Sequence, residues 1–281
     1  MINMKKAKED GQRFVHRAKK SLGQNFLNSE HVGEQIIDCA NLSGMDCVLE
    51  IGPGKGMLTE KLLKKAGKVI AVEKDDALIP FLQDKFGAEI ASGKLTLVHD
   101  DILLCDLSSY NLKPNSFKLV ANIPYYITGL LFRKFLEEGP QPSEMVVMVQ
   151  KEVALRILAR DKRESLLSVS VKVYGEPSIV TYVGAGNFTP KPNVDSAVLK
   201  ISNISRDFFK DGSGALDEKY FFEFLKTGFA HKRKHLLGNL LATDIARGKL
   251  EEIFKKINIS PTCRAENLTS QDWKRLAKEL L

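Results

Sequence analysis

An amide, a proline turn and two aromatic rings follow one another in the stretch Asn122-Ile123-Pro124-Tyr125-Tyr126, directly after an apolar run. Pro124 fixes its own φ and favours extended backbone at Ile123, so a strand that arrives here must end. The Asn122 side chain and the Ile123 carbonyl can accept hydrogen bonds, and a tyrosine ring can stack on a flat partner. These groups could hold an uncharged base through its amino group. The simpler alternative is an ordinary turn after a strand.

A second candidate site is the glycine turn Gly52-Pro53-Gly54-Lys55-Gly56, which lies between an apolar β-run at Cys47–Ile51 and a helical pattern. Glycines let a backbone approach a ligand closely, and a helix N-terminus offers free N–H groups. Glu73 ends the next predicted strand, 68–72, about twenty residues beyond the first glycine, where an acid can bind ribose hydroxyls. The proline and the glycine spacing differ from the dinucleotide fingerprint. They favour another adenosine cofactor and make a nicotinamide dehydrogenase the weakest interpretation.

The next two predicted strands end in polar residues as well. A run at 95–98 leads to Asp101, and a run at 117–121 leads to Asn122. The carboxyl ends of parallel strands line one crevice of a doubly wound sheet, where an Asp can accept a hydrogen bond from an adenine amino group. We therefore expect four strands to deliver their terminal residues to one edge of a single sheet. These residues are Gly52, Glu73, Asp101 and Asn122.

This combination resembles the ribosomal RNA adenine N6-dimethyltransferase family, most closely its bacterial small-subunit (16S) branch. The resembling motifs are Lys20-Ser21-Leu22-Gly23-Gln24-Asn25-Phe26-Leu27, Leu49-Glu50-Ile51-Gly52-Pro53-Gly54, Val72-Glu73, Asp101, Asn122-Ile123-Pro124-Tyr125-Tyr126 and Asn187-Phe188-Thr189-Pro190-Lys191-Pro192-Asn193-Val194-Asp195-Ser196. Many amino methyltransferases share the Asn-aliphatic-Pro-Tyr motif, but its pairing with the Gly-Gln-Asn-Phe loop is far more specific. The resemblance implies a Rossmann-like class I α/β fold with a mostly parallel seven-stranded sheet and a small all-α C-terminal domain.

The resemblance also implies S-adenosyl-L-methionine as cosubstrate, S-adenosyl-L-homocysteine as product, and no metal ion. The cofactor-binding residues that it predicts are Asn25, Leu27, Gly52, Gly54, Glu73, Asp101 and Asn122. By the same resemblance, Asn25 and Leu27 help to close the site, and Gly52 lies against the methionine part. Glu73 holds the ribose hydroxyls, and Asp101 meets the adenine.

The implied reaction moves a methyl group to the exocyclic N6 of adenine, with two transfers per base. Because the lone pair of that nitrogen is delocalised into the ring, we expect positioning to do most of the work. Asn122 and the Ile123 carbonyl, held by Pro124, would accept the N6 hydrogens and favour a pyramidal nitrogen. Tyr125 and Phe188 would stack on the base after it leaves its RNA stack. The simpler interpretation of Phe188 is a hydrophobic anchor in a stiff loop.

The composition is that of an ordinary globular protein of 281 residues, with a formal charge of +7 and a pI of about 9.1. The excess of positive charge favours nucleic acid or an anionic surface as partner. The four cysteines form neither CxxC pairs nor a metal spacing, so we expect reduced thiols. Neither a signal peptide nor a membrane-spanning apolar run occurs, so we expect a soluble cytoplasmic protein without a membrane partner. We also expect a monomer.

Basic residues gather in three places, which are the arm at 1–20, the cluster Arg156, Arg160, Lys162 and Arg163, and the run His231-Lys232-Arg233-Lys234-His235. Such clusters can be merely solvated, but together they fit structured RNA. We expect a flexible basic arm at 1–20, a methyltransferase domain at 21–204 and a helical RNA-binding domain at 205–281. The implied partner is 16S rRNA or the immature small ribosomal subunit, and the implied process is rRNA processing in ribosome biogenesis.

The remaining expected elements follow from periodicity and turn residues. They are helices at 130–136, 220–229, 236–242, 250–257 and 271–281, and strands at 145–149, 178–183 and 195–201. Thr269, three positions before Asp272, predicts a cap for the last helix. The segment 166–173 alternates like a strand, but the family has a helix there and we follow the family. Glu164-Ser165 departs from the Tyr-Gly that the family often has before this segment.

Two other functions fit much of the pattern. A large-subunit (23S) rRNA adenine N6-methyltransferase of the macrolide-resistance type would share fold, cofactor and pocket. The run Arg264-Ala265-Glu266-Asn267-Leu268, the continuation Tyr126-Ile127-Thr128 and the full Gly-Gln-Asn-Phe-Leu loop look more like the small-subunit branch. A non-catalytic RNA- or DNA-binding assembly factor would keep the fold and use only its basic surface. The presence of every predicted cofactor position argues against that factor.

Overall fold

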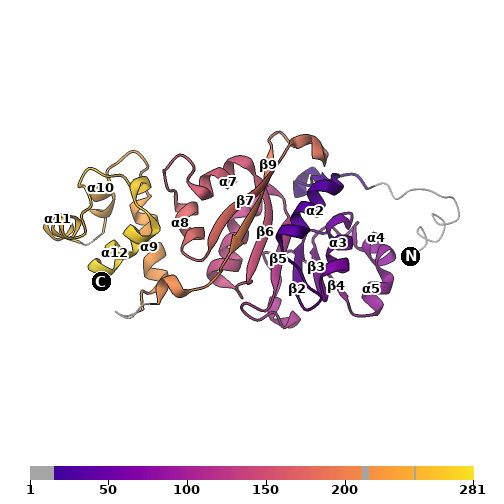
Figure 1. Ribbon diagram of the computed structural model, residues 1–281. Helices are drawn as coiled ribbons and strands as arrows, with labels where there is room; N and C mark the ends of the chain where they lie inside the picture. Colours follow the sequence, from indigo (N-terminus) through magenta and orange to yellow (C-terminus); the bar gives the residue numbers. More distant parts are fainter. Residues whose placement is uncertain (1–15, 211–214, 244) are drawn as a thin grey trace.

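The computed structural model describes residues 16–210, 215–243 and 245–281, so most of the predicted basic arm at 1–20 lies outside the described residues. A seven-stranded sheet crosses the molecule in the order β4-β3-β2-β5-β6-β9-β7 (Figure 1). Its strands are β2 (Cys47–Ile51), β3 (Lys68–Glu73), β4 (Leu95–His99), β5 (Lys118–Asn122), β6 (Glu144–Gln150), β7 (Glu176–Val183) and β9 (Ser196–Ser202). Neighbouring strands are parallel except for β9, which is antiparallel to β6 and β7. The predicted mostly parallel seven-stranded sheet is confirmed.

The central strands are apolar runs because both faces of the sheet are covered. Alternate residues of β2 show this, since Val48 and Leu49 point to opposite faces and belong to different hydrophobic clusters. The cluster of Val48 includes α2 (Glu30–Cys39), α3 (Met57–Lys65) and α4 (Ile79–Lys85). The cluster of Leu49 includes α6 (Thr128–Phe132), the π-helix η4 (Arg133–Glu138), α7 (Lys151–Leu158) and α8 (Leu166–Lys172). The chain therefore forms a three-layer α/β/α arrangement.

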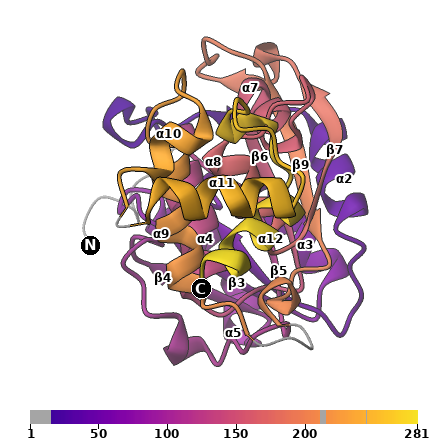
Figure 2. The same ribbon diagram turned by 90° about the vertical axis from the view of Figure 1, so that its left-hand side faces the viewer.

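Four helices follow the last strand and lie together at one end of the molecule (Figures 1 and 2). They are α9 (Glu218–Gly228), α10 (Leu236–Leu240), α11 (Arg247–Lys256) and α12 (Ser270–Leu280). Trp273 is fully buried among them, and a Cβ on Gly228 would lie only 2.3 Å from its ring, so only glycine fits there. One hydrophobic cluster runs from the sheet into these helices. The proposed boundary at 204/205 follows β9, and the division into domains stays a prediction.

Two local expectations for helices are confirmed. Segment 166–173 forms helix α8 and not a strand, because Ser165 caps it in a reciprocal capping box with Ser168. Thr269 likewise caps α12 in a capping box with Asp272. The single helix expected at 130–136 is instead the short α6 followed by the π-helix η4. A wider helical turn inside a helix is not visible in apolar periodicity.

Short elements complete the chain. They are α5 (Gly87–Ala91), the strands β1 (Phe26–Leu27) and β8 (Phe188–Thr189), and the 3-10 helices η1 (Lys20–Leu22), η2 (Leu107–Tyr110), η3 (Tyr125–Ile127), η5 (Ala185–Asn187), η6 (Asp207–Phe209) and η7 (Ala265–Asn267). Strands β1 and β8 pair antiparallel in a separate two-stranded sheet. In the described part of the chain, no helix is both long and apolar enough to cross a membrane.

Candidate active site

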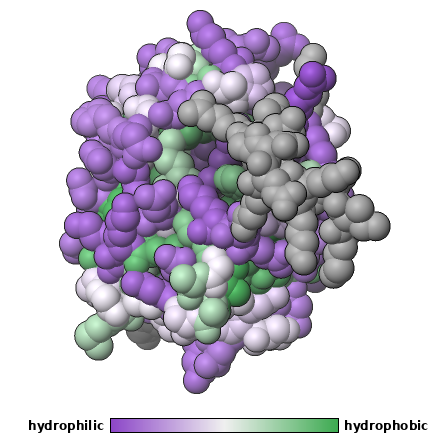
Figure 3. Space-filling view, turned by 90° about the vertical axis from the view of Figure 1, so that its right-hand side faces the viewer, coloured by the Kyte–Doolittle hydropathy of each residue, from purple (hydrophilic) through white to green (hydrophobic). Residues whose placement is uncertain are grey.

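One cavity lies at the carboxyl ends of β2, β3, β4 and β5. Its lining includes all the predicted cofactor-binding residues, Asn25, Leu27, Gly52, Gly54, Glu73, Asp101 and Asn122. The parallel register brings three of these residues together. Ile51 pairs with both Val72 and Ala121, so the next residue of each strand, Gly52, Glu73 and Asn122, lies beside the other two. On the face turned to the viewer in Figure 3, hydrophobic residues gather in the middle of a hydrophilic surface.

The glycine turn and Glu73 form one wall of this cavity. Gly54 has a φ of 59°, and its N–H donates a hydrogen bond of 3.0 Å to Oε2 of Glu73. The N–H of Asp75 donates to Oε1 at 2.8 Å. Burial raises the pKa of the Glu73 carboxyl above its ordinary value, and these two N–H groups partly offset the rise. Glu73 is thus held rigidly at the cavity, as a residue that binds ribose hydroxyls must be.

Asp101 lines the same cavity just after β4, the strand next to β3. Its Oδ1 accepts a hydrogen bond from the N–H of Leu103 at 3.0 Å, and its Oδ2 contacts Lys74 Nζ at 2.7 Å. Burial alone would raise the pKa of the Asp101 carboxyl, but Lys74 and the Leu103 N–H lower it overall. The carboxyl is therefore ionised near neutral pH and can accept a hydrogen bond from an amino group.

Asn122 ends β5 next to the glycine turn. Among the described residues, a Cβ on Gly52 would meet only the Asn122 carbonyl oxygen within 4 Å, at 3.7 Å, so this part of the structure leaves the space above the glycine open. The Asn122 amide nitrogen points to the Asn25 carbonyl at 3.4 Å. With that orientation, the side-chain oxygen is the atom that can accept a hydrogen bond from a substrate amino group. Ile123 and Pro124 line the same cavity.

The Tyr125 ring is held at its tip and at its backbone. Its hydroxyl lies 2.6 Å from the hydroxyl of Ser196, the first residue of β9, and burial raises its pKa. Its carbonyl accepts a hydrogen bond from the Thr128 hydroxyl at 2.9 Å. Tyr126 lies at the rim of the cavity with 60% of its surface exposed. The fixed ring of Tyr125 thus fits a stacking surface better than that of Tyr126.

Phe188 does not join the other predicted residues. Its side chain is 3% exposed and packs in the hydrophobic cluster beneath α2 and α3, and its strand pairs it with Leu27. Phe188 is not among the described residues that line the cavity. The burial matches the hydrophobic anchor that was the simpler interpretation, and a stacking role for Phe188 stays a prediction.

Sequence reasoning missed a second buried carboxylate at this cavity. Glu50 is 1% exposed and lines the cavity, and within the described residues its two oxygens have no partner of hydrogen-bonding geometry. Burial raises the pKa of the Glu50 carboxyl to about 8. The neighbouring Thr59 lowers this pKa, but by less than burial raises it. The sequence does contain a signal for it, a glutamate inside an otherwise apolar strand. Burying an unpaired carboxylate costs free energy, so such a residue points to a functional role. Near neutral pH, the Glu50 carboxyl is therefore largely protonated.

The sheet, the glycine turn and the acid at the end of β3 define a class I S-adenosylmethionine-dependent methyltransferase. A sequence model of the family described as "Ribosomal RNA adenine dimethylase" matches residues 15–281, and the chain belongs to this family. The "Ribosomal RNA small subunit methyltransferase A" of Dehalococcoides mccartyi (strain CBDB1) is 43% identical over 278 residues, which cover 98% of this chain and 93% of the relative. The protein of the same name from Fusobacterium nucleatum subsp. nucleatum is 38% identical over 267 residues, which cover 94% and 97%.

Two solved structures share this fold over most of the chain. A dimethyladenosine transferase from Plasmodium falciparum superposes with a TM-score of 0.73 at 26% identity, over 89% of this chain and 95% of that one. The 23S rRNA methyltransferase ErmE superposes with a TM-score of 0.70 at 25% identity, over 91% and 99%. The fold prediction and the resemblance seen in the motifs are both confirmed.

Proposed function

We propose that this protein transfers methyl groups from S-adenosyl-L-methionine to N6 of two adjacent adenines near the 3′ end of 16S rRNA, giving N6,N6-dimethyladenosine. The observation that carries the proposal is the meeting of Asn122, the Ile123 carbonyl and the fixed Tyr125 ring beside the glycine turn. Identity with small-subunit methyltransferases over nearly the whole chain favours the small subunit as substrate. The enzyme would act in the cytoplasm during assembly of that subunit, as a monomer.

The residues at the cavity fit the cofactor. Glu73 presents a rigid carboxylate for vicinal hydroxyls, and Asp101 presents an ionised acceptor for an adenine amino group. The open space above Gly52 would receive the methionine part, with Gly54 beside it, and Asn25 and Leu27 would cover the site from the N-terminal side. The bound cofactor supplies a methyl group that is already activated on a positively charged sulfur. The residues of the chain must therefore bind and orient the cofactor and the target base, and exclude water from the cavity.

The target base would enter beside Asn122. Its side-chain oxygen and the Ile123 carbonyl would accept the two N6 hydrogens, which withdraws the lone pair from the ring and aims it at the methyl group. The Tyr125 ring, held by Ser196, would stack on the face of the base. Since burial keeps Tyr125 protonated at neutral pH, its contribution is stacking and not proton transfer.

Two basic clusters would bind the surrounding RNA. The run 231–235 is exposed in the turn between α9 and α10, and Arg156, Arg160, Lys162 and Arg163 are exposed along and after α7. Basic residues outside the pocket add affinity through phosphates, and this affinity falls with salt. The basic arm would add to it in the same way.

The deciding experiment uses labelled S-adenosyl-L-methionine and ribosomal subunits from cells that lack this modification. We expect label in small subunits or their precursors, and mass mapping should find it as dimethyladenosine near the 3′ end of 16S rRNA. Label in 23S rRNA alone would establish the second candidate, which the superposition with ErmE favours. Cofactor binding without transfer to either subunit would contradict both. Absence of cofactor binding in calorimetry would favour a non-catalytic assembly factor.

A further inference from the structure

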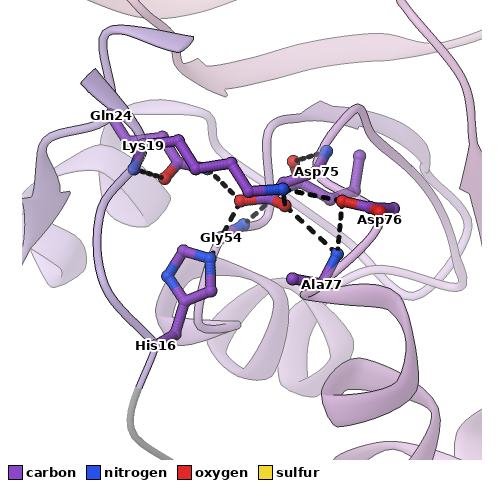
Figure 4. A network of polar contacts seen from close by, with 8 residues as sticks. His16, Lys19, Gln24, Gly54, Asp75, Asp76 and Ala77 are labelled. Carbon is purple, nitrogen blue, oxygen red and sulfur yellow. Dashed lines mark hydrogen bonds and ion pairs between the residues drawn. The ribbon is translucent and has the colours of Figure 1, made fainter. Parts of the chain in front are cut away.

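We propose that Asp75 is a positioning residue that anchors the N-terminal segment 16–27 over the cofactor cavity. Asp75 is 1% exposed, and three side chains of this segment converge on its carboxylate (Figure 4). The contacts are His16 Nε2 at 2.9 Å, Lys19 Nζ at 2.6 Å and Gln24 Nε2 at 2.6 Å. The Ala77 N–H donates the remaining hydrogen bond at 3.1 Å. The proposal rests on the proposed function only for the identity of the cofactor.

The partners of this carboxylate come from far away in the chain. His16, Lys19 and Gln24 lie 59, 56 and 51 positions before Asp75, so they contact it only when the N-terminal segment is in place. A buried carboxylate without partners is strongly disfavoured, so the segment and the carboxylate stabilise each other. Burial alone would raise the pKa of Asp75, but Lys19, Gln24, the Ala77 N–H and His16 together lower it to about 2. The anchor is therefore charged under all ordinary conditions.

The anchored segment is a wall of the cavity. Leu22, Gln24, Asn25, Phe26 and Leu27 all line it. On the other side of the anchor, the Asp75 N–H donates to Glu73. The same residue therefore connects the ribose-binding acid to the loop that covers the site.

A second attachment holds the far end of the segment. Strand β1 pairs with β8, and Asn28 Nδ2 donates to the Thr189 hydroxyl at 2.6 Å. Residues between the two attachments, including Asn25, span the cavity. Asn25 lies between these two attachments, so its position over the cavity is fixed only when both hold. It therefore depends on the Asp75 anchor. Without it, the segment would remain tethered at β1 but would cover the cavity for a smaller fraction of time.

The first test measures the segment without cofactor. We expect Asp75→Asn to raise the amide hydrogen-exchange rate of residues 19–25, while exchange in the central strands stays as in the parent protein. Asp46→Asn is the matched control. The Asp46 carboxylate also accepts hydrogen bonds, from the N–H and the hydroxyl of Ser43. It directly precedes β2, at the end of that strand farthest from the cavity. Unchanged exchange at 19–25 in a folded Asp75→Asn protein would overturn the proposal.

The second test measures cofactor binding. Loss of charge-assisted hydrogen bonds should raise the Kd for S-adenosyl-L-methionine about tenfold and speed its release, with kcat at saturating cofactor changed less. A role only in stability would instead lower the melting temperature at unchanged Kd, which overturns the proposal. Lys19→Met removes one surface partner and should weaken binding about threefold, so it tests the anchor even if Asp75→Asn does not fold. If the parent protein bound no cofactor, the proposed function would fail while the exchange result still decided the anchor.

Discussion

The N–H of Gly54 donates a hydrogen bond of 3.0 Å to the carboxylate of Glu73, which lies 19 positions later in the chain. The other oxygen of this carboxylate accepts from the Asp75 N–H at 2.8 Å. Both oxygens are therefore oriented by backbone donors before any ligand binds. This relationship connects the glycine turn after β2 with the end of β3, and makes the two motifs one structural unit.

Glu73→Gln should weaken cofactor binding. A glutamine has one accepting oxygen, so one of the two buried N–H groups loses its partner at a cost of about 1–3 kcal/mol. We expect the Kd for S-adenosyl-L-methionine in calorimetry to rise about tenfold or more. Glu89→Gln, at a partly exposed position of α5 that does not line the cavity, is the control and should bind as the parent protein does. Equal affinity of the two variants would contradict the assignment of Glu73.

Asn122→Ala should abolish methyl transfer and lower cofactor affinity far less, because the other predicted cofactor-binding residues remain. The side-chain oxygen is assigned to one N6 hydrogen of the base, and its loss leaves the Ile123 carbonyl to orient the amino group without its second acceptor. Single-turnover transfer should fall at least about a hundredfold, as expected for a lost group that acts in the transition state. Near-normal turnover would show that Asn122 does not position the base.

Ser196→Ala should impair the reaction through Tyr125. Ser196 is fully buried and its hydroxyl lies 2.6 Å from the Tyr125 hydroxyl, so the substitution leaves a half-buried phenol without this partner. We expect a loss of stability of about 1 kcal/mol and a several-fold lower transfer rate. Tyr125→Phe breaks the same bond, so the double variant should be no worse than either single variant. Additive losses would show that the hydroxyl pair does not act as a unit.

The pH dependence of stability should reveal Glu50. Its pKa in the folded protein is about 8, against an ordinary value of 4.5, so the folded state keeps a proton that the unfolded chain releases. Stability therefore falls as pH rises through this window and is unaffected below it. Glu50→Gln should flatten the fall in melting temperature between pH 5 and 8, measured without cofactor. Parallel melting curves for the two proteins across this range would exclude a buried neutral Glu50.

Neutralising the basic turn between α9 and α10 should weaken RNA binding and not cofactor binding. The three basic residues at 232–234 are exposed, and each phosphate contact contributes about 0.7–0.9 to the slope of log affinity against log salt. Replacing them with Gln should lower that slope by about 2. The control replaces Lys64, Lys65 and Lys68, which are exposed near the start of β3. Equal effects in both variants would point to net charge instead of a binding surface.

Local pattern was enough to predict much of the site. Apolar runs that end in Gly52, Glu73, Asp101 and Asn122 predict parallel strands with polar carboxyl ends, and such ends share one edge in any doubly wound sheet. Helix caps such as Thr269 are equally local, since the capping groups lie within one turn. Local alternation gave the wrong indication at 166–173, where it is typical of a strand. The segment is a helix, which begins with a capping box between Ser165 and Ser168.

The sequence by itself determined the strands, the glycine turn and the family motifs, because each depends on residues close together in the chain. Only the tertiary structure decided that β1 pairs with β8, that Phe188 is buried and that three N-terminal side chains converge on Asp75. These contacts join residues up to 163 positions apart, as Phe26 and Thr189 are, and periodicity carries no information on which distant segment a residue will meet. The position of the N-terminal segment over the cavity therefore depends on the tertiary structure, whereas the residues at the strand ends that line the cavity could be predicted from local sequence.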